Sequence, residues 1–293
     1  MTSRPLNGYA IVLASALLLG TLGMFSKLFF DAGGEPFTLL VLRFAGAGPA
    51  LLAIALLRPA PWPGRRMILA GIALGALQLF IAWALFEGFA RAPVGLVVLL
   101  FFAYPLLTTV GGALLFREEL GPGRVLVLAL GMGGVALTVG VPDSANAAGV
   151  VLGLAAGLGL AAMILCARYV LTAGGIQPLQ LSGLMFTSPL LVLVPWAAVR
   201  GIDLDLTGEA WAAALGAVVI SVVIPIALFY TGVKLVGAGT ASLLGVGEPL
   251  AGVVLAFLVL GESLAALQLA GGVLILVAVA LLGLQARRLA APT

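Results

Sequence analysis

One apolar segment holds a carboxylate and a helix-breaking residue side by side. Residues 243–255 read LLGVGEPLAGVVL, where Glu248 stands directly before Pro249. An ionised carboxylate deep in apolar surroundings is costly, so Glu248 must face protein or water, be paired, or be protonated. Two chemical roles stay open for it: binding the ammonium group of a small molecule, and carrying a proton. The alternative is a static hydrogen bond to a neighbouring helix.

Tyr104 and Pro105 form a similar pair in another apolar segment. Val97, Phe101, Tyr104 and Thr108 follow one another at i, i+4, i+7 and i+11, which places them on one face of a helix. A stripe of apolar, aromatic and hydroxyl groups is typical of a small-molecule cavity, although a plain helix–helix contact uses the same pattern. We predict Phe101 and Tyr104 as substrate-binding residues.

Gln78 is a polar side chain near the middle of a third apolar segment, and Ala82 lies one helical turn after it. An amide in such surroundings needs hydrogen-bond partners, which a neighbouring helix or a substrate can supply. Met163 is a soft, adaptable side chain that suits a cavity wall as well as ordinary packing. We predict substrate contacts for Gln78, Ala82 and Met163, as for Glu248.

Arg43 carries a charge inside the apolar segment 36–57. At about 1.5 Å rise per residue, it lies about 12 Å from the outer end of that helix. Its side chain either extends to the aqueous face or pairs with an acid such as Glu87 or Glu248. We expect its role to be structural.

Several kinds of chemistry are excluded by missing residues. The sequence has no histidine and one cysteine, Cys166, which excludes imidazole ligands, histidine bases and an internal disulfide. The G-x-x-x-x-G-K-[ST] pattern of ATP hydrolysis is absent, and all the aspartates lie between the apolar segments. We therefore expect no enzyme, no metal site, no cofactor and no nucleic-acid partner; the oligomeric state stays open.

The composition places these residues in a membrane. The chain of 293 residues is 63% hydrophobic and only 9% charged, whereas soluble domains carry roughly 25% charged residues. Apolar runs of about 20 residues match the length of a membrane helix. They predict an all-α polytopic membrane protein with ten transmembrane helices, at 8–30, 36–57, 67–89, 93–115, 124–141, 148–170, 178–199, 210–233, 238–260 and 265–286.

Basic residues gather on one side of these spans. With an even number of spans both termini face the same side, and that side carries ten Lys and Arg residues against three on the other. Cytoplasmic loops are enriched in Lys and Arg. We therefore expect both termini in the cytoplasm.

The second half of the chain repeats the first. Residues 84–120 and 227–264 both open with ALF, and Pro105 matches Pro249 at a separation of 144 residues. Arg91 likewise matches Lys234, and Glu118 matches Glu262 at short turns, where we expect both acids to cap helices.

The repeat divides the chain into two five-helix units, residues 1–145 and 146–293, within one membrane domain. Because five is odd, the second copy enters the membrane from the opposite side. Inverted repeats of this kind are typical of secondary transporters, which hold substrate near the midplane. Pro105 and Pro249 would kink their helices at equivalent depths, and we predict both as hinges for alternating access.

The ordered motifs resemble a known family. They are RF at 43–44, ALF…AP…YPLL…FREEL from residue 84, and the later form ALF…GEPL…LGESL. Over about residues 8–286 the chain is similar to the EamA family of the drug/metabolite transporter superfamily, and its length and layout resemble amino-acid exporters of the YddG type. The resemblance implies a place in a bacterial inner membrane, and export from the cytoplasm through a central cavity lined mainly by spans 1, 3, 4, 6, 8 and 9.

The first hypothesis is a secondary-active or facilitative exporter of small metabolites, with aromatic or neutral amino acids as the leading substrates. A second is a transporter of the same superfamily for cationic drugs or nucleotide sugars. Nucleotide sugars rank lower, because their phosphates need basic groups at depth and only Arg43 is available. A membrane-embedded enzyme or scaffold is the alternative from a different class.

Overall fold

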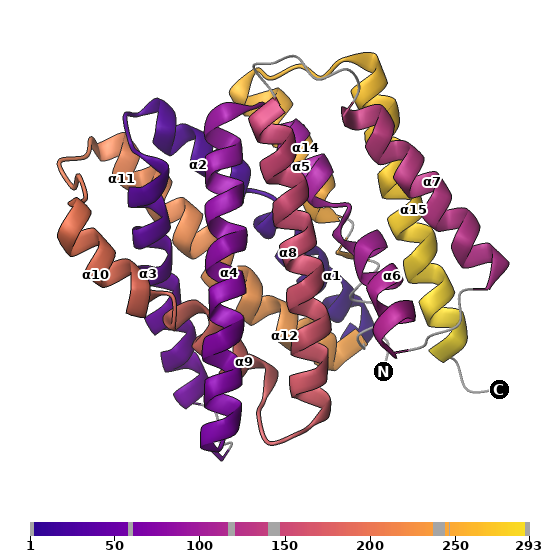
Figure 1. The fold of residues 1–293 in the computed structure, drawn as a ribbon, viewed down its shortest axis with the longest axis horizontal. Helices are drawn as coiled ribbons and strands as arrows, with labels where there is room; N and C mark the ends of the chain where they lie inside the picture. Colours follow the sequence, from indigo (N-terminus) through magenta and orange to yellow (C-terminus); the bar gives the residue numbers. More distant parts are fainter. Residues whose placement is uncertain are drawn as a thin grey trace.

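The structure is a computed structural model that describes residues 3–57, 61–116, 121–139, 147–236, 244–245 and 247–290. Every regular element in these ranges is a helix (Figure 1). In the first half these are α1 (Ser3–Leu19), α2 (Leu22–Asp31), α3 (Pro36–Leu56), α4 (Arg65–Arg91), α5 (Val94–Phe101), α6 (Tyr104–Phe116) and α7 (Pro122–Val139). In the second half they are α8 (Ala147–Thr172), α9 (Pro178–Thr187), α10 (Leu190–Arg200), α11 (Gly208–Leu215), the π-helix η1 (Gly216–Val223), α12 (Ile224–Val236), α14 (Gly247–Leu260) and α15 (Ala266–Ala290).

These helices correspond to the predicted membrane spans. Within the described ranges, seven helical stretches are long and apolar enough to cross a membrane, and three shorter apolar helices accompany them. Each falls in a different predicted span, in the same order. Helices suit this environment because they satisfy their backbone hydrogen bonds internally. The chain is therefore an all-α polytopic membrane protein with ten transmembrane spans.

Several spans are interrupted near mid-depth, which the apolar runs did not predict. The first span breaks at Gly20–Thr21, the fourth at Phe102–Ala103, and the seventh at Ser188–Pro189. The fourth-span break follows from Pro105, whose ring nitrogen cannot donate to the carbonyl of Phe101 one turn earlier. Pro249 is placed similarly to Pro105, because each lies in the first turn of a helix, α14 and α6, where proline is tolerated.

The packing of the helices reflects two inverted repeats. Helices from equivalent spans of the two halves lie side by side: α3 with α9, α5 with α14, and α7 with α15. Other close pairs join spans that are not equivalent. The third span (α4) packs on the sixth (α8), and the first span (α1) packs on the eighth (α12). A twofold-related pair of five-helix units produces this pattern, and Figure 1 shows α7 beside α15 and α4 beside α8.

The molecule has two faces with respect to the membrane. The first helix begins and the last helix ends toward the same, lower edge of Figure 1. We use the term terminal half for the part of the membrane domain nearest that edge, which contains one end of every span. The opposite far half adjoins the connections at 32–35, 92–93, 201–207 and 261–265.

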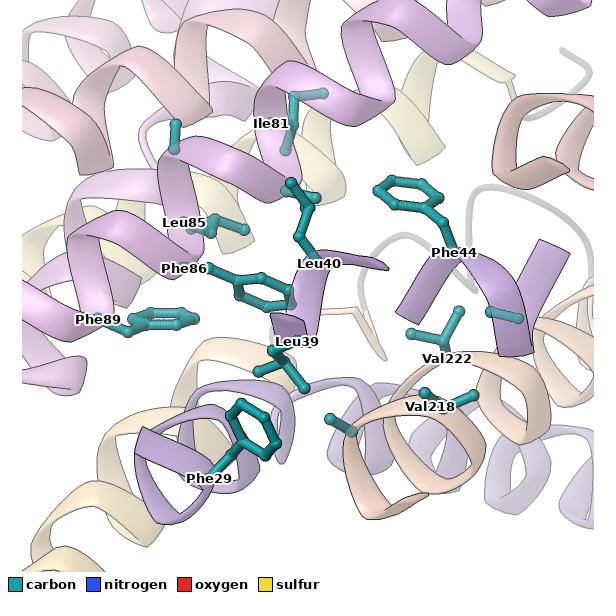
Figure 2. Close-up of a cluster of buried hydrophobic side chains, with 14 of the residues drawn as sticks. Phe29, Leu39, Leu40, Phe44, Ile81, Leu85, Phe86, Phe89, Val218 and Val222 are labelled. Carbon is teal, nitrogen blue, oxygen red and sulfur yellow. The ribbon is translucent and has the colours of Figure 1, made fainter. Parts of the chain in front are cut away.

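The far half is tightly packed. Phe29 of α2, Phe44 of α3 and Phe86 of α4 are fully buried, and they meet aliphatic side chains from η1 (Figure 2). In lipid such packing acts through close van der Waals contact, because exclusion of water contributes little there. The far half therefore contains the main apolar core of the described chain.

Candidate functional site

A cavity of about 810 Å³ lies between the two repeats. This volume is within the range of small-molecule sites, about 300–1,000 Å³. Each lining residue lies at mid-depth or in the terminal half of its span. The polar, aromatic and sulfur-containing lining residues are Ser15, Gln78, Phe102, Tyr104, Thr108, Thr109, Met163, Ser182, Met185, Phe186, Phe229 and Glu248.

Most of the predicted substrate residues are brought together by the fold. Gln78, Tyr104, Met163 and Glu248 line this one cavity from α4, α6, α8 and α14, and Pro105 lies beside Tyr104 on its wall. Their contact with a substrate stays a prediction. Pro249 does not line the cavity, and its side chain is buried in the first turn of α14.

Two predicted residues lie behind the cavity wall. Ala82 and Phe101 are buried in the apolar core and do not line the cavity. The ring of Phe101 stacks on that of Tyr104, with centroids 5.6 Å apart. Ala82 lies one turn beyond Gln78 toward the far half. Both residues therefore support the wall from behind in this conformation.

The sequence reasoning missed lining residues on other helices. Ser15, Met185 and Phe186 are small or apolar residues within apolar runs, so nothing in their local pattern distinguishes them. Met185 and Phe186 do stand 142 residues after Arg43 and Phe44, the RF pair. The repeat alignment was the one signal that could have found them.

Glu248 lies where the first span breaks. A Cβ atom added to Gly20 would overlap the backbone carbonyl oxygen of Glu248 and would lie 2.7 Å from the Cβ of Ala251. Only glycine allows the broken first span to approach α14 so closely. The ion pairs of the described residues join Lys27 with Asp31, Arg91 with Glu87, and Arg200 with Glu35, so none involves Glu248.

Side-chain hydroxyl groups form hydrogen bonds between the first span and the eighth. Ser15 Oγ donates to the carbonyl oxygen of Pro225 at 2.8 Å, and the hydroxyls of Thr21 and Ser221 are 2.8 Å apart. Ser221 stands 143 residues after Gln78, so the two repeats carry polar side chains at equivalent places. Ser221 lies within the π-helix η1 and Pro225 follows it by two residues; a π-helix is rare and often occurs at functional sites.

Arg43 adopts neither of its predicted arrangements. Its side chain does not extend to the aqueous face, because the residue is only 6% exposed, and Glu87 pairs with Arg91 instead. The guanidinium carbon lies 5.5–5.9 Å from the ring centroids of Phe44, Phe86 and Phe186. Cation–π attraction of about 1–2 kcal/mol per desolvated contact offsets part of the cost of burying the charge.

Glu262 caps a helix, but not the one expected. Its two carboxylate oxygens accept the backbone N–H groups of Val94 and Gly95, at 2.9 and 3.1 Å, at the start of α5 in the other repeat. The N-terminus of α15 is instead capped by Gln268, which accepts the N–H of Ala265 at 2.9 Å. Glu118, the repeat equivalent of Glu262, lies outside the described residues.

The far face carries a charged contact between the repeats. Arg200, at the end of α10, lies 3.6 Å from the carboxylate of Glu35, which precedes α3. Its guanidinium also sits 4.6 Å from the ring centroid of Phe37. On the opposite face Gln177 occupies the position equivalent to Glu35, so this charged contact has no counterpart there.

The fold and the cavity define a multi-pass membrane protein built from two inverted five-helix repeats around a central cavity. Comparison with known proteins gives the family. The EamA-like transporter family model matches residues 6–140 and again residues 147–284. The chain therefore belongs to the EamA-like transporter family, within the drug/metabolite transporter superfamily. The predicted division between residues 145 and 146 lies outside the described residues.

Relatives and a solved structure agree with this assignment. The chain is 28% identical to the uncharacterized transporter sll1319 of Synechocystis over 74% of its own length and 67% of that protein. It is 25% identical to an uncharacterized transporter of Archaeoglobus fulgidus, over 93% and 94% of the two chains. A crystal structure that is 20% identical superposes with a TM-score of 0.64 over 96% of this chain and 99% of the other, which shows the fold alone.

Proposed function

We propose that this protein is a secondary-active or facilitative exporter of small metabolites, with aromatic and neutral amino acids as its substrates. One observation carries the proposal: the cavity occupies the terminal half as far as mid-depth, while packed side chains of the far half close its other end. An inverted repeat can exchange the conformations of its two copies, which would open the far half and close the terminal half. The structure would then represent one of the two end states of alternating access.

The proposal gives roles to particular residues. Gln78, Tyr104, Met163 and Glu248 contact the substrate from four helices. Pro105 and Pro249 act as hinges, because each lies in the first turn of a helix, α6 or α14, that begins near the middle of its span. The repeats, residues 1–145 and 146–293, move relative to one another. Both termini lie in the cytoplasm of a bacterial cell, so the cavity faces the cytoplasm and loads substrate there.

Flux into proteoliposomes that contain only the purified protein tests this function. A panel of amino acids, sugars and cationic drugs is screened for counterflow of a labelled compound, with protein-free liposomes as control. We expect phenylalanine and other neutral amino acids to exchange. Exchange of cationic drugs alone would favour the second hypothesis, for which the acid Glu248 on the cavity wall is the supporting observation. No flux for any class would contradict transport.

Glu248→Gln tests the acid itself, in the same liposomes with and without a pH gradient. If Glu248 carries a coupled proton, the variant still exchanges substrate but no longer responds to the gradient. If it binds the ammonium group, exchange falls at every pH. Tyr104→Phe is a comparison variant, because it removes a neutral polar group of the cavity at the equivalent position of the other repeat and should leave the response to the gradient unchanged. Unchanged exchange together with an unchanged gradient response would refute both roles.

A further inference from the structure

Arg43 is a buried cation without a counter-ion in the described part of the chain. The residue is 6% exposed, and its Nε and Nη1 atoms have no hydrogen-bond partner. The three phenylalanine rings around it provide attraction but accept no conventional hydrogen bond. A guanidinium has five N–H donors that match a carboxylate in pairs, so the site is electrostatically incomplete as it stands.

This cation lies at the closed end of the cavity. Phe186 lines the cavity, and its ring centroid is only 5.7 Å from the guanidinium carbon of Arg43. One aromatic side chain therefore separates the charge from the substrate space. On the other side of Arg43, Phe44 and Phe86 belong to the packed far half. A molecule that leaves through the far half has to pass this group.

The ring of Phe186, which separates Arg43 from the cavity, lies next to an interruption of its span. Phe186 lies near the end of α9, directly before the break at Ser188–Pro189 that separates α9 from α10. It also contacts Phe44, its equivalent in the first repeat, with ring centroids 5.9 Å apart. A contact between equivalent residues of the two repeats lies close to the axis that relates them. The hydroxyl of Thr187, the next residue, is a second buried polar group that lacks a partner.

The two repeats differ in charge at this point. Met185 occupies the position equivalent to Arg43 and lines the cavity, so only the first repeat contributes a cation. The acid of the cavity, Glu248, comes from the second repeat. The cavity and its closed end thus offer one negative and one positive group on different helices.

We propose that Arg43 binds the carboxylate of the transported molecule when Phe186 moves aside, so that the substrates are zwitterions. The inference deepens the function proposed above and rests on it. Glu248 receives the ammonium group in the open cavity, and Arg43 receives the carboxylate at the closed end as the far half opens. Cationic compounds without a carboxylate enter the cavity but do not engage Arg43.

The test compares L-phenylalanine with its amide, which keeps the ring and the amino group and loses only the carboxylate. Binding is measured by the shift in thermal unfolding, and transport by exchange in proteoliposomes. Arg43→Met installs the residue of the equivalent position in the second repeat, and Arg43→Lys keeps a charge without the paired donors. We expect Arg43→Met to weaken L-phenylalanine binding by about tenfold to a hundredfold, the effect of losing a charged hydrogen bond. The affinity of Arg43→Met for the amide should stay within about twofold of the wild-type value. The affinity of Arg43→Lys for L-phenylalanine should lie between those of the wild type and Arg43→Met.

Phe186→Ala provides a variant that leaves Arg43 in place. Removing the ring should strengthen binding of L-phenylalanine and not of the amide, and adding Arg43→Met should abolish that gain. If Arg43→Met and Phe186→Ala each change the affinity for L-phenylalanine and for its amide by the same factor, then Arg43 only holds the surrounding aromatic side chains in place. That result overturns the proposal. Equal affinity of the wild-type protein for both probes, or none for either, overturns it as well.

The two proposals fail in different ways. If the wild-type protein binds L-phenylalanine with the expected preference but does not exchange it, transport is refuted and the carboxylate site stands. If acid and amide exchange equally and Arg43→Met slows both equally, the carboxylate site is refuted and transport stands.

Discussion

The terminal and far halves of the molecule are built from the same ten spans, yet they differ in what fills the space between them. The terminal half surrounds a cavity lined by polar, aromatic and sulfur-containing side chains. The far half contains phenylalanine rings and aliphatic side chains in close contact. Because the repeats are inverted, each half of the membrane receives equivalent residues from opposite copies. The difference therefore arises from how the copies are placed and from the few positions where their sequences differ.

The packing of the far half gives the largest expected effect. Phe86→Ala removes a fully buried ring that contacts the Arg43 guanidinium. Phenylalanine-to-alanine changes in cores cost about 3–5 kcal/mol, and we expect the lower end because lipid is itself apolar. Thermal or denaturant unfolding in detergent measures the loss. Met163→Ala on the cavity wall is the control; an equal loss there would mean that the two halves do not differ in packing.

The close approach at mid-depth gives the next effect. Gly20→Ala places a methyl group against the Glu248 carbonyl oxygen and the Cβ of Ala251, so the break of the first span must move away from α14. Overpacking of this kind costs about 1–3 kcal/mol. Gly133→Ala is the matched control, since nothing lies within 4 Å of its added Cβ. Equal stability of the two variants would contradict the proximity of the first span and α14.

The cap contributed by Glu262 tests the far face between the repeats. Glu262→Ala leaves the N–H groups of Val94 and Gly95 without their acceptor. Loss of a helix cap costs about 0.5–2 kcal/mol. Glu262→Gln retains one oxygen and should lose less, as measured by unfolding. An alanine variant as stable as the wild type would show that water replaces the carboxylate at no cost.

The ion pair between Arg200 and Glu35 gives the smallest effect. Glu35→Gln copies the neutral residue of the equivalent position, Gln177, and removes the charge difference between the faces. Exposed ion pairs contribute about 0–1 kcal/mol, so stability should hardly change. Exchange rates in liposomes should change by less than about fivefold and only at low salt. A large change that persists at high salt would require another role for Glu35.

The fold was largely predictable, and its irregularities were not. Continuous apolar runs and the repeat predicted the spans, because a membrane permits few alternatives to helices. Prolines did not predict the breaks: Pro49 and Pro195 lie inside helices, whereas Pro105 and Pro189 stand at interruptions. In a bilayer, neighbouring helices can satisfy the groups that a proline frees. Whether a span breaks is thus decided by its neighbours.

The same irregularities limited prediction of the site. The stripe from Val97 to Thr108 assumed one continuous helix, but the break at Phe102–Ala103 changes the direction of the side chains across it. Tyr104 and Thr108 consequently line the cavity and Phe101 does not. Gln78 and Glu248 were recognisable because polar groups at depth are rare. Phe186 was not, because one phenylalanine in an apolar run looks like any other.

The packing of non-equivalent spans on one another bears on why the chain carries both copies. The first span packs on the eighth, the third packs on the sixth, and Glu262 of one copy caps a helix of the other. A single five-helix unit would leave each of these faces uncovered. A chain of that length alone would need a second copy inserted upside down to cover them, whereas the repeat supplies both orientations in one polypeptide. Because the two copies are separate stretches of sequence, they can differ: Arg43 occurs only in the first copy and Glu248 only in the second.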